Sequence, residues 1–176
     1  MKNILQNDNI YLRALEPEDL ALLYEWENST ENWQVSNSLI PYSKYTLEKF
    51  IESSTQDIFQ TKQVRMMIIN KIDQKAIGAI DLFDFDPFHL RAGVGILIGD
   101  IEMRKKGYAS EALEVIVSYS GKVLQLKQLY CNITEDNKDS LKLFIQKSFV
   151  ITGQKKDWIK SQNGYLTEYF LQLQLF

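Results

Sequence analysis

An apolar stretch, a basic turn and an amphipathic segment follow one another in the middle of the chain. The stretch RAGVGILIG (91–99) predicts a strand, and the segment from about Lys106 predicts a helix, because its apolar residues recur at helical spacing. The amides of a first helical turn lack partners and lie at the positive end of the helix dipole. Arg104, Lys105 and Lys106 add positive charge there, and Gly107 lets an anion approach the backbone closely. The turn is therefore a candidate phosphate or pyrophosphate site.

A solvated basic turn is the alternative interpretation of the same residues. Two other phosphate-binding patterns are absent, since the chain contains neither G-x-G-x-x-G nor G-x-x-x-x-G-K-[ST]. The turn alone therefore indicates an anion site without saying which anion binds.

Composition limits the remaining classes of protein. With 176 residues, 45% of them hydrophobic, and no linker-like tract, we expect a single domain over residues 1–176. A net charge of -3 argues against a nucleic-acid partner. The only cysteine, Cys131, allows no internal disulfide and no zinc cluster, so no metal is expected. No signal peptide and no apolar run of membrane-spanning length occur, which predicts a soluble, cytoplasmic protein without a membrane partner.

The rest of the chain alternates between strand and helix patterns. Strands are predicted at NIYLRAL, at QVRMMIIN and KAIGAIDLF joined by a turn at 71–74, and at QLYCNI, FVITGQKK and EYFLQLQLF. Helices are predicted after Pro17, after a Ser43 cap, from Lys106 and in NKDSLKLFIQKS, with a polar loop between the first two. The predicted class is α/β (α+β) with a central sheet.

The spacing Arg104-x-x-Gly107-x-Ala109 after an apolar strand resembles the acetyl-coenzyme A motif of the Gcn5-related N-acetyltransferases (GNAT). YASEAL continues the resemblance, LYCNITEDNKDSLKLFIQKSFV is similar to the family's second coenzyme motif, and the order of elements fits along the chain. GVGILIGD and the first-helix region resemble the branch with ribosomal-protein N-terminal, diamine and spermidine acetyltransferases. The resemblance implies a mixed, mostly antiparallel sheet splayed between its fourth and fifth strands and flanked by about four helices.

The resemblance also implies how acetyl-CoA, the co-substrate, is bound. Pantetheine would enter the splayed gap along the backbone of Ile96 and Ile98, and the pyrophosphate would lie on the amides of residues 104–109. Asn137 would bind the pantetheine or phosphate arm, a role compatible with that of a helix N-cap. The expected coenzyme-binding residues are Ile96, Leu97, Ile98, Arg104, Lys105, Lys106, Gly107, Tyr108, Ala109, Asn137 and Phe144.

The catalytic positions depart from the family pattern. The family's tyrosine acid is replaced by Phe144, its following glycine by Ser148, and a strand glutamate found in several relatives by Gly93. Candidates for the missing base lie in IDLFDFDPFHLR, where Asp81 and His89 are preferred over Asp84 and Asp86. A polar loop bounded by Pro87 explains the same composition without catalysis.

Acidic residues gather in and before the first helices (Glu16, Glu18, Asp19, Glu25, Glu27 and Glu31). They suit a cationic acceptor such as a polyamine, a diamine or a protein N-terminus, although a charged solvent face would have the same composition. Trp33 and Asp84 are candidate substrate-binding residues; Trp26, Tyr42 and Tyr45 could also line an acceptor site or belong to the core. An N-acetyltransferase is the preferred function. A coenzyme-binding relative without turnover, a non-enzymatic interaction module and assembly into a homo-oligomer stay open.

Overall fold

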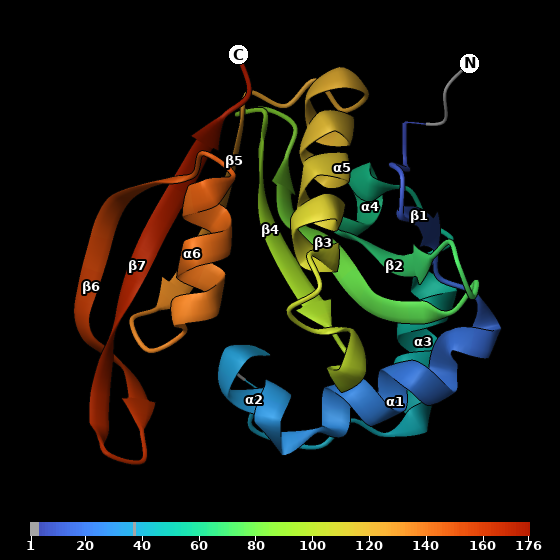
Figure 1. The fold of residues 1–176 in the computed structure, drawn as a ribbon, viewed down its shortest axis with the longest axis horizontal. Coiled ribbons are helices and arrows are strands. Elements are labelled where there is room, and N and C mark those ends of the chain that lie inside the picture. The colour runs from blue at the N-terminus through green and yellow to red at the C-terminus, as the bar shows by residue number, and fades with distance from the viewer. Residues whose placement is uncertain (1–3, 37) are drawn as a thin grey trace.

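The computed structural model of the protein describes residues 4–36 and 38–176, and its strands form one sheet in the order β1-β2-β3-β4-β5-β7-β6 (Figure 1). All neighbouring strands are antiparallel except β4 and β5, which are parallel. The strands are β1 (Ile10–Ala14), β2 (Val64–Asn70), β3 (Ala76–Asp86), β4 (Arg91–Ile98), β5 (Gln128–Thr134), β6 (Val150–Ser161) and β7 (Gly164–Gln174). The predicted mixed, mostly antiparallel sheet is confirmed.

The four predicted helices correspond to the longer ones of the described chain: α1 (Leu20–Asn28), α3 (Lys44–Ser53), α5 (Tyr108–Lys122) and α6 (Lys138–Gln146). Two short helices, α2 (Thr30–Ser36) and α4 (Ile58–Thr61), were not predicted. The region expected to be a polar loop forms α2, because the chain is extended only at Ser29 after α1 and then turns helical again. No helix among the described residues has both the length and the apolar character needed to cross a bilayer.

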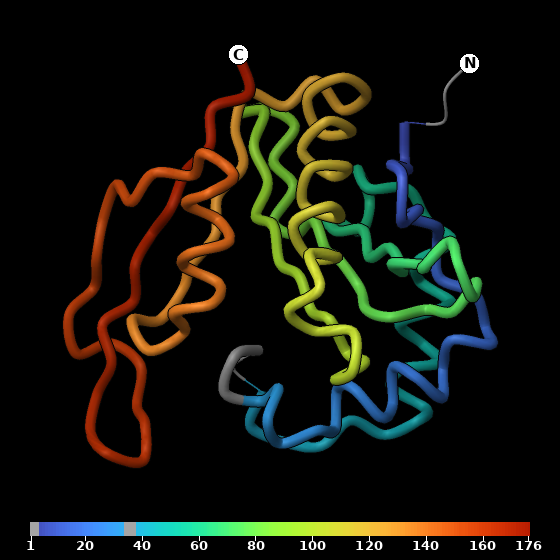
Figure 2. The backbone as a smooth tube through the Cα atoms, in the orientation of Figure 1, coloured from blue at the N-terminus to red at the C-terminus, as the bar shows by residue number. Residues whose placement is uncertain are grey.

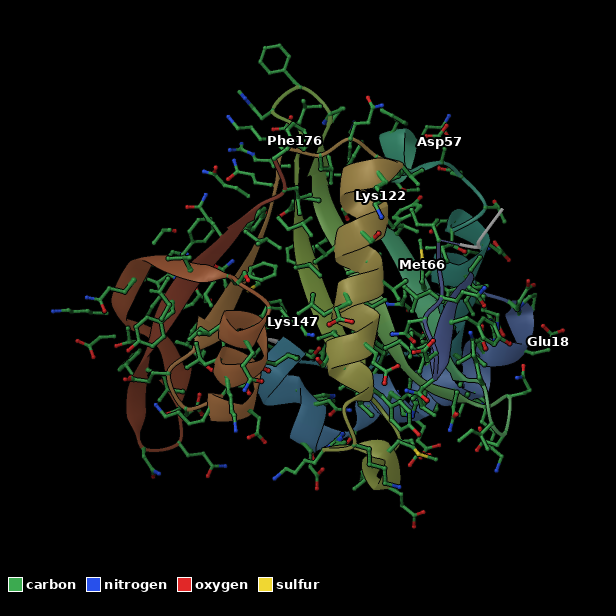
Figure 3. All side chains as sticks on the ribbon, turned by 45° about the horizontal axis from the view of Figure 1, so that its top comes forward. Glu18, Asp57, Met66, Lys122, Lys147 and Phe176 are labelled. Atoms are coloured by element: carbon green, nitrogen blue, oxygen red, sulfur yellow. The ribbon has the colours of Figure 1, made fainter. Side chains whose placement is uncertain are left out.

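Two apolar cores lie on opposite faces of the sheet. Ala112, Leu113 and Ile116 of α5 and Phe144 of α6 pack in one core with inward residues of β1 to β5. Trp26 of α1 and residues of α3 pack on the other face against β2, β3 and Leu97 of β4. At the far end of α6, Lys147 forms an ion pair with Glu114 of α5, which ties the two helices of the first face together (Figure 3).

The sheet opens between β4 and β5. These strands pair only between residues 91–93 and 128–130, while β4 stays paired with β3 as far as Ile98 and β5 stays paired with β7 as far as Thr134. Their backbones run together at one end and diverge toward the other (Figure 2). The predicted splay between the fourth and fifth strands is therefore confirmed. One edge of β4 has no partner strand beyond Gly93 within the described chain.

The third strand is longer than the sequence indicates. It extends to Asp86, so Asp84 belongs to β3 and not to the polar loop that the composition suggested, whereas Asp81 already lies within the predicted strand KAIGAIDLF. The register shifts between Phe83 and Asp86, and Asp84 has a left-handed φ of 48°. This irregularity conceals the strand in the sequence, because aspartate is uncommon in strands and tolerates left-handed turns.

Candidate functional site: a cavity between the splayed strands

The N-terminus of α5 is open. Gly107 is its N-cap with a φ of 91°, and no side chain caps the helix. A Cβ built on Gly107 would meet no atom within 4 Å, so the space over this turn is free. The first amides of α5 have no partner within the helix, and they lie at the positive end of the helix dipole. These are the features of an anion site at a helix end.

The sequence predicts that the three basic side chains of the turn add their charge to an anion site, but Arg104 bonds to other residues of the protein. Arg104 donates from Nε to the Ile98 carbonyl (2.9 Å) and from Nη2 to Asn32 Oδ1 (3.3 Å). Its guanidinium thus connects the turn to α2. Lys105 lies 3.7 Å from Asp139 of α6, but both side chains are more than 80% exposed, so this contact is weak. The backbone and the exposed lysines, more than Arg104, are left to contact an anion.

A cavity of about 430 Å³ fills the opening between β4 and β5. Four of the predicted coenzyme-binding residues line it: Ile96, Leu97, Asn137 and Phe144. Ile98 lies outside this lining, and its carbonyl is the one bonded to Arg104. Asn137 is the N-cap of α6, where its Oδ1 accepts from the Ser140 amide (3.2 Å), so the structural role anticipated for it is present.

Phe144 and Phe149 lie on either side of the C-terminal end of α6 and contact each other. The Phe149 amide donates to the Phe144 carbonyl and the Ser148 amide to the Ile145 carbonyl, which together form a Schellman motif. The two rings meet edge to face with centroids 4.9 Å apart. Phe144 is buried and lines the cavity, where the family carries its tyrosine acid.

Phe144→Tyr is expected to leave acetyl transfer unchanged or to raise it modestly, by no more than about threefold. The added hydroxyl supplies a proton donor in the cavity, but a coenzyme thiolate is a weak enough base to take its proton from solvent. Steady-state kinetics measure the effect, with a thermal melt to check folding. A collapse of turnover in a folded variant would show that the Phe144 ring is required for its shape.

Ser148→Gly is expected to stabilise the protein by about 0.5–1 kcal/mol, because Ser148 has a φ of 67°, a conformation that strains residues with a Cβ. For a chain of this size, the midpoint of thermal unfolding should rise by roughly 2 °C. Ser148→Ala is the matched control, since alanine keeps the strained Cβ and should give no gain. Equal melting points for the glycine and alanine variants would contradict the strain.

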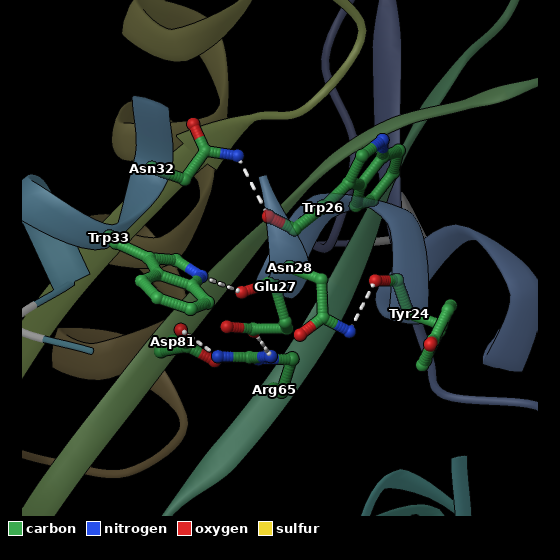
Figure 4. Close-up of polar contacts among 8 residues, drawn as sticks. All are labelled: Tyr24, Trp26, Glu27, Asn28, Asn32, Trp33, Arg65 and Asp81. Carbon is green, nitrogen blue, oxygen red and sulfur yellow. Dashed lines mark hydrogen bonds and ion pairs between the residues drawn. The ribbon is translucent and has the colours of Figure 1, made fainter. Parts of the chain in front are cut away.

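A second wall of the cavity is polar. Arg65 of β2 forms a two-pronged pair with Asp81 of β3, from Nε to Oδ1 (2.6 Å) and from Nη2 to Oδ2 (3.0 Å). Its Nη1 also pairs with Glu27 of α1, and its guanidinium lies 5.2 Å from the Phe50 ring centroid. Figure 4 shows Arg65 between the two carboxylates. All three charged residues line the cavity, and we call them the Glu27–Arg65–Asp81 cluster.

The three charged side chains of the cluster are largely shielded from solvent. The side chains of Glu27, Arg65 and Asp81 are 15%, 20% and 28% exposed. Burial lowers the pKa of Arg65, but the charges and hydrogen bonds of Asp81 and Glu27 more than offset it, so this pKa lies above its ordinary value. Arg65 therefore stays cationic and pairs with both carboxylates. Each carboxylate oxygen keeps a second lone pair that can accept a proton or a hydrogen bond.

His89 lies away from the cavity. It is exposed in the turn between β3 and β4, where its amide donates to Asp86 Oδ1 (2.9 Å), and its ring meets Phe88. Roughly 16 Å of extended strand separate Arg91 from Ile96. The structure thus does not bring the two preferred candidates together: Asp81 lines the cavity, and His89 does not.

Asp84 also lies outside the lining of the cavity and accepts a hydrogen bond from the Tyr130 hydroxyl (3.1 Å). Burial, followed by the bond to Asp84, raises the pKa of Tyr130 to about 12. This places Asp84 as a partner of Tyr130 on β5, not as a wall of an acceptor site.

The position of the family's strand glutamate is blocked. A Cβ on Gly93 would lie 2.3 Å from the ring of Phe83, so this ring fills the space above Gly93. Asp81, which precedes Phe83 on the same face of β3, pairs in register with Gly95 of β4. A carboxylate of this chain, that of Asp81, therefore comes from the neighbouring strand, at the register position two residues further along β4.

The remaining acceptor candidates lie outside the lining of the cavity. Trp26 is buried, with its ring against Gly99, and belongs to the core. Trp33 of α2 donates from Nε1 to the Glu27 carbonyl (2.8 Å), so it lies beside the Glu27–Arg65–Asp81 cluster (Figure 4). Asp19 is buried against Arg13 and contributes to folding. Tyr42 and Tyr45 are exposed.

Cys131 lines the cavity but does not offer a nucleophile. Its side chain is buried, and burial raises the pKa of the Cys131 thiol to about 12. Because the thiolate is the reactive form, an acetyl group is not expected to pass through this residue.

A mixed sheet opened between two parallel strands, with an uncapped helix N-terminus beside the opening, is the architecture of an acetyltransferase. The sequence profile of the acetyltransferase (GNAT) domain matches residues 9–147. The chain belongs to this family, and the predicted N-acetyltransferase is confirmed at this level.

Two curated relatives and one solved structure illustrate the similarity. An uncharacterised N-acetyltransferase, p20 of Bacillus licheniformis, is 25% identical over 96% of this chain and 94% of its own. A spermidine N(1)-acetyltransferase of Vibrio cholerae is 25% identical over 84% of this chain and 82% of its own. The crystal structure of a Vibrio cholerae spermidine N-acetyltransferase with CoA and spermine superimposes with a TM-score of 0.87, at 21% identity, over 96% and 97% of the two chains.

Proposed function

We propose that the protein transfers the acetyl group of acetyl-CoA to the primary amine of a cationic acceptor. One observation carries this proposal: a single cavity is bounded by the unpaired edge of β4 and by the Glu27–Arg65–Asp81 cluster. An acyl donor and an amine can meet there without either crossing the sheet.

The open strand edge and the open helix end fit the two ends of a coenzyme. The amides of Tyr108 and Ala109, at the uncapped N-terminus of α5, would bind the pyrophosphate. The unpaired edge of β4 along Ile96 and Leu97 would accept pantetheine as an extra strand. Acetyl-CoA supplies the acetyl thioester, and the protein supplies its orientation.

Asp81 is the proposed proton acceptor. An alkylamine has a pKa of roughly 10, so at neutral pH it arrives protonated and must lose a proton before it attacks. Asp81 would take this proton directly or through water, with Arg65 fixing its carboxylate in the cavity. A backbone amide near Ile96 would stabilise the oxyanion, and solvent would protonate the thiolate.

Diamines, polyamines and protein N-termini are the proposed acceptors. The activity named for the Vibrio cholerae relative supports the first two, and the acidic cavity wall suits all three. A cytoplasmic setting suits the free thiol of Cys131. Assembly into a homo-oligomer is compatible with the exposed edge strand β6, where Val150 and Trp158 lie open.

The alternative is a coenzyme-binding protein without turnover, which Phe144 and Gly93 favour because the family's usual acid and base are both absent. Two measurements separate the cases. Coenzyme A should raise the melting temperature in both, because a ligand of the native state stabilises it. Acetyl transfer across polyamines, alkylamines and peptide N-termini should be detected only for the enzyme. Coenzyme binding without transfer to any amine would establish the alternative, and no binding would refute both.

A further inference from the structure

The far wall of the cavity carries a third carboxylate. Glu168 of β7 lines the cavity, and its side chain is 10% exposed. In the sheet it pairs in register with Thr134, which also lines the cavity. A carboxylate this well shielded requires a positive partner, because a buried unpaired charge is unfavourable.

That partner is Lys155 of β6, directly across the β6–β7 hairpin from Glu168. Its Nζ lies 3.0 Å from Glu168 Oε2 and 5.3 Å from the Trp158 ring centroid, so two groups hold the ammonium in place. Lys155 itself is 48% exposed at its side chain and does not line the cavity. It covers Glu168 from the solvent side.

The charges of the cavity then nearly cancel. Among the described residues that line it, Glu27, Asp81 and Glu168 contribute three negative charges and Arg65 one positive charge, a net charge of -2. Lys155 reduces this to -1. A single ammonium group therefore balances the site, while a second one would compete with Lys155 for Glu168.

We propose that the Lys155–Glu168 pair makes this enzyme selective for primary amines with one positive charge, against diamines and polyamines. Lys155 Nζ already neutralises the Glu168 carboxylate that the distal ammonium of a long diamine would otherwise pair with. This inference rests on the proposed function and narrows its acceptors: diamines and polyamines remain substrates, but poorer ones than amines with a single positive charge. Lys155 is a specificity-determining residue and takes no part in the transfer itself.

The separation of the two walls sets the length of diamine that would reach both. From β3 to β7 the sheet spans three strand spacings, roughly 14 Å before the splay and the inward reach of the side chains are considered. Short diamines would not reach Glu168 from the Glu27–Arg65–Asp81 cluster, and long ones would.

The test compares n-alkylamines with α,ω-diamines of the same length, from diaminobutane to diaminododecane, by kcat/KM. The wild type should use each monoamine at least as well as its matched diamine. Lys155→Met should raise kcat/KM about tenfold for the long diamines and leave monoamines within about twofold. Lys156→Met removes the same charge from the adjacent, exposed residue, which does not line the cavity, and should change neither series.

A second variant keeps the inference open to refutation. Adding Glu168→Gln to Lys155→Met should abolish the gain for long diamines, because the carboxylate that binds them is gone. A wild-type preference for diamines, or equal effects of Lys155→Met and Lys156→Met, would overturn the inference and leave the proposed function intact. Absence of transfer to every amine would instead refute the proposed function, and this inference with it.

Discussion

Gly107→Asp should lower the affinity for coenzyme A by at least about a hundredfold, whereas Gly107→Asn should lower it by no more than about tenfold. Asparagine and aspartate have the same size and both tolerate the left-handed conformation of this residue, so the pair isolates the charge. A carboxylate at the uncapped N-terminus of α5 would occupy the proposed pyrophosphate position and repel its charge. Titration calorimetry with coenzyme A measures both constants.

Gly164 provides the matched control for this pair. It has a φ of 128°, no atom would lie within 4 Å of its Cβ, and it lies at the β6–β7 turn, away from α5. Gly164→Asp should therefore leave the affinity for coenzyme A unchanged. Equal losses in Gly107→Asp and Gly107→Asn would mean that the backbone conformation matters and that no anion binds over Gly107.

Asp81→Asn should lower turnover by roughly a hundredfold, the scale on which one acid–base group contributes. The amide keeps the size of the side chain and can still accept a hydrogen bond from Arg65, but it cannot take a proton from the amine. The affinity for coenzyme A should stay the same, because the open end of α5 is a separate element. Raising the pH should partly restore turnover, since more of the amine then arrives unprotonated.

Glu27→Gln and His89→Ala are the comparisons for Asp81. Glu27→Gln removes the same charge from the other side of Arg65 and should lower turnover by no more than about tenfold, whereas His89→Ala should have no effect. A large loss of turnover in Glu27→Gln, together with a wild-type rate in Asp81→Asn, would assign the role of proton acceptor to Glu27. Full activity in both variants would leave water as the only acceptor.

The elements with regular patterns could be predicted, and the irregular ones could not. Apolar spacing located all seven strands and the four longer helices, and the turn at 104–107 located the open helix end. By contrast, α4 is one turn long, α2 follows α1 after a single extended residue, and β3 is irregular at Asp84. Such features depend on backbone angles that short polar stretches do not encode uniquely.

The candidate site was predicted in part, because its residues come from distant parts of the chain. Asp81 and Phe144 were named in advance, whereas Arg65 and Glu168 were not, and Glu27 was noted only as one of several acids. Glu27 and Arg65 are 38 residues apart, and no local pattern connects them. One signal was available for Arg65: a hairpin with its turn at 71–74 places residues near 65 opposite Asp81, as the register Arg65↔Asp81 shows.

The contact between Phe83 and Gly93 has an evolutionary consequence. Any side chain added at position 93 would meet the Phe83 ring, so this ring would have to move before a glutamate could fit there. A smaller residue at position 83 would make that room, but it would also remove one ring from the contact with Tyr130. The two positions are therefore epistatic. Substitutions at the two positions should have non-additive effects on stability, because each changes the space left for the other.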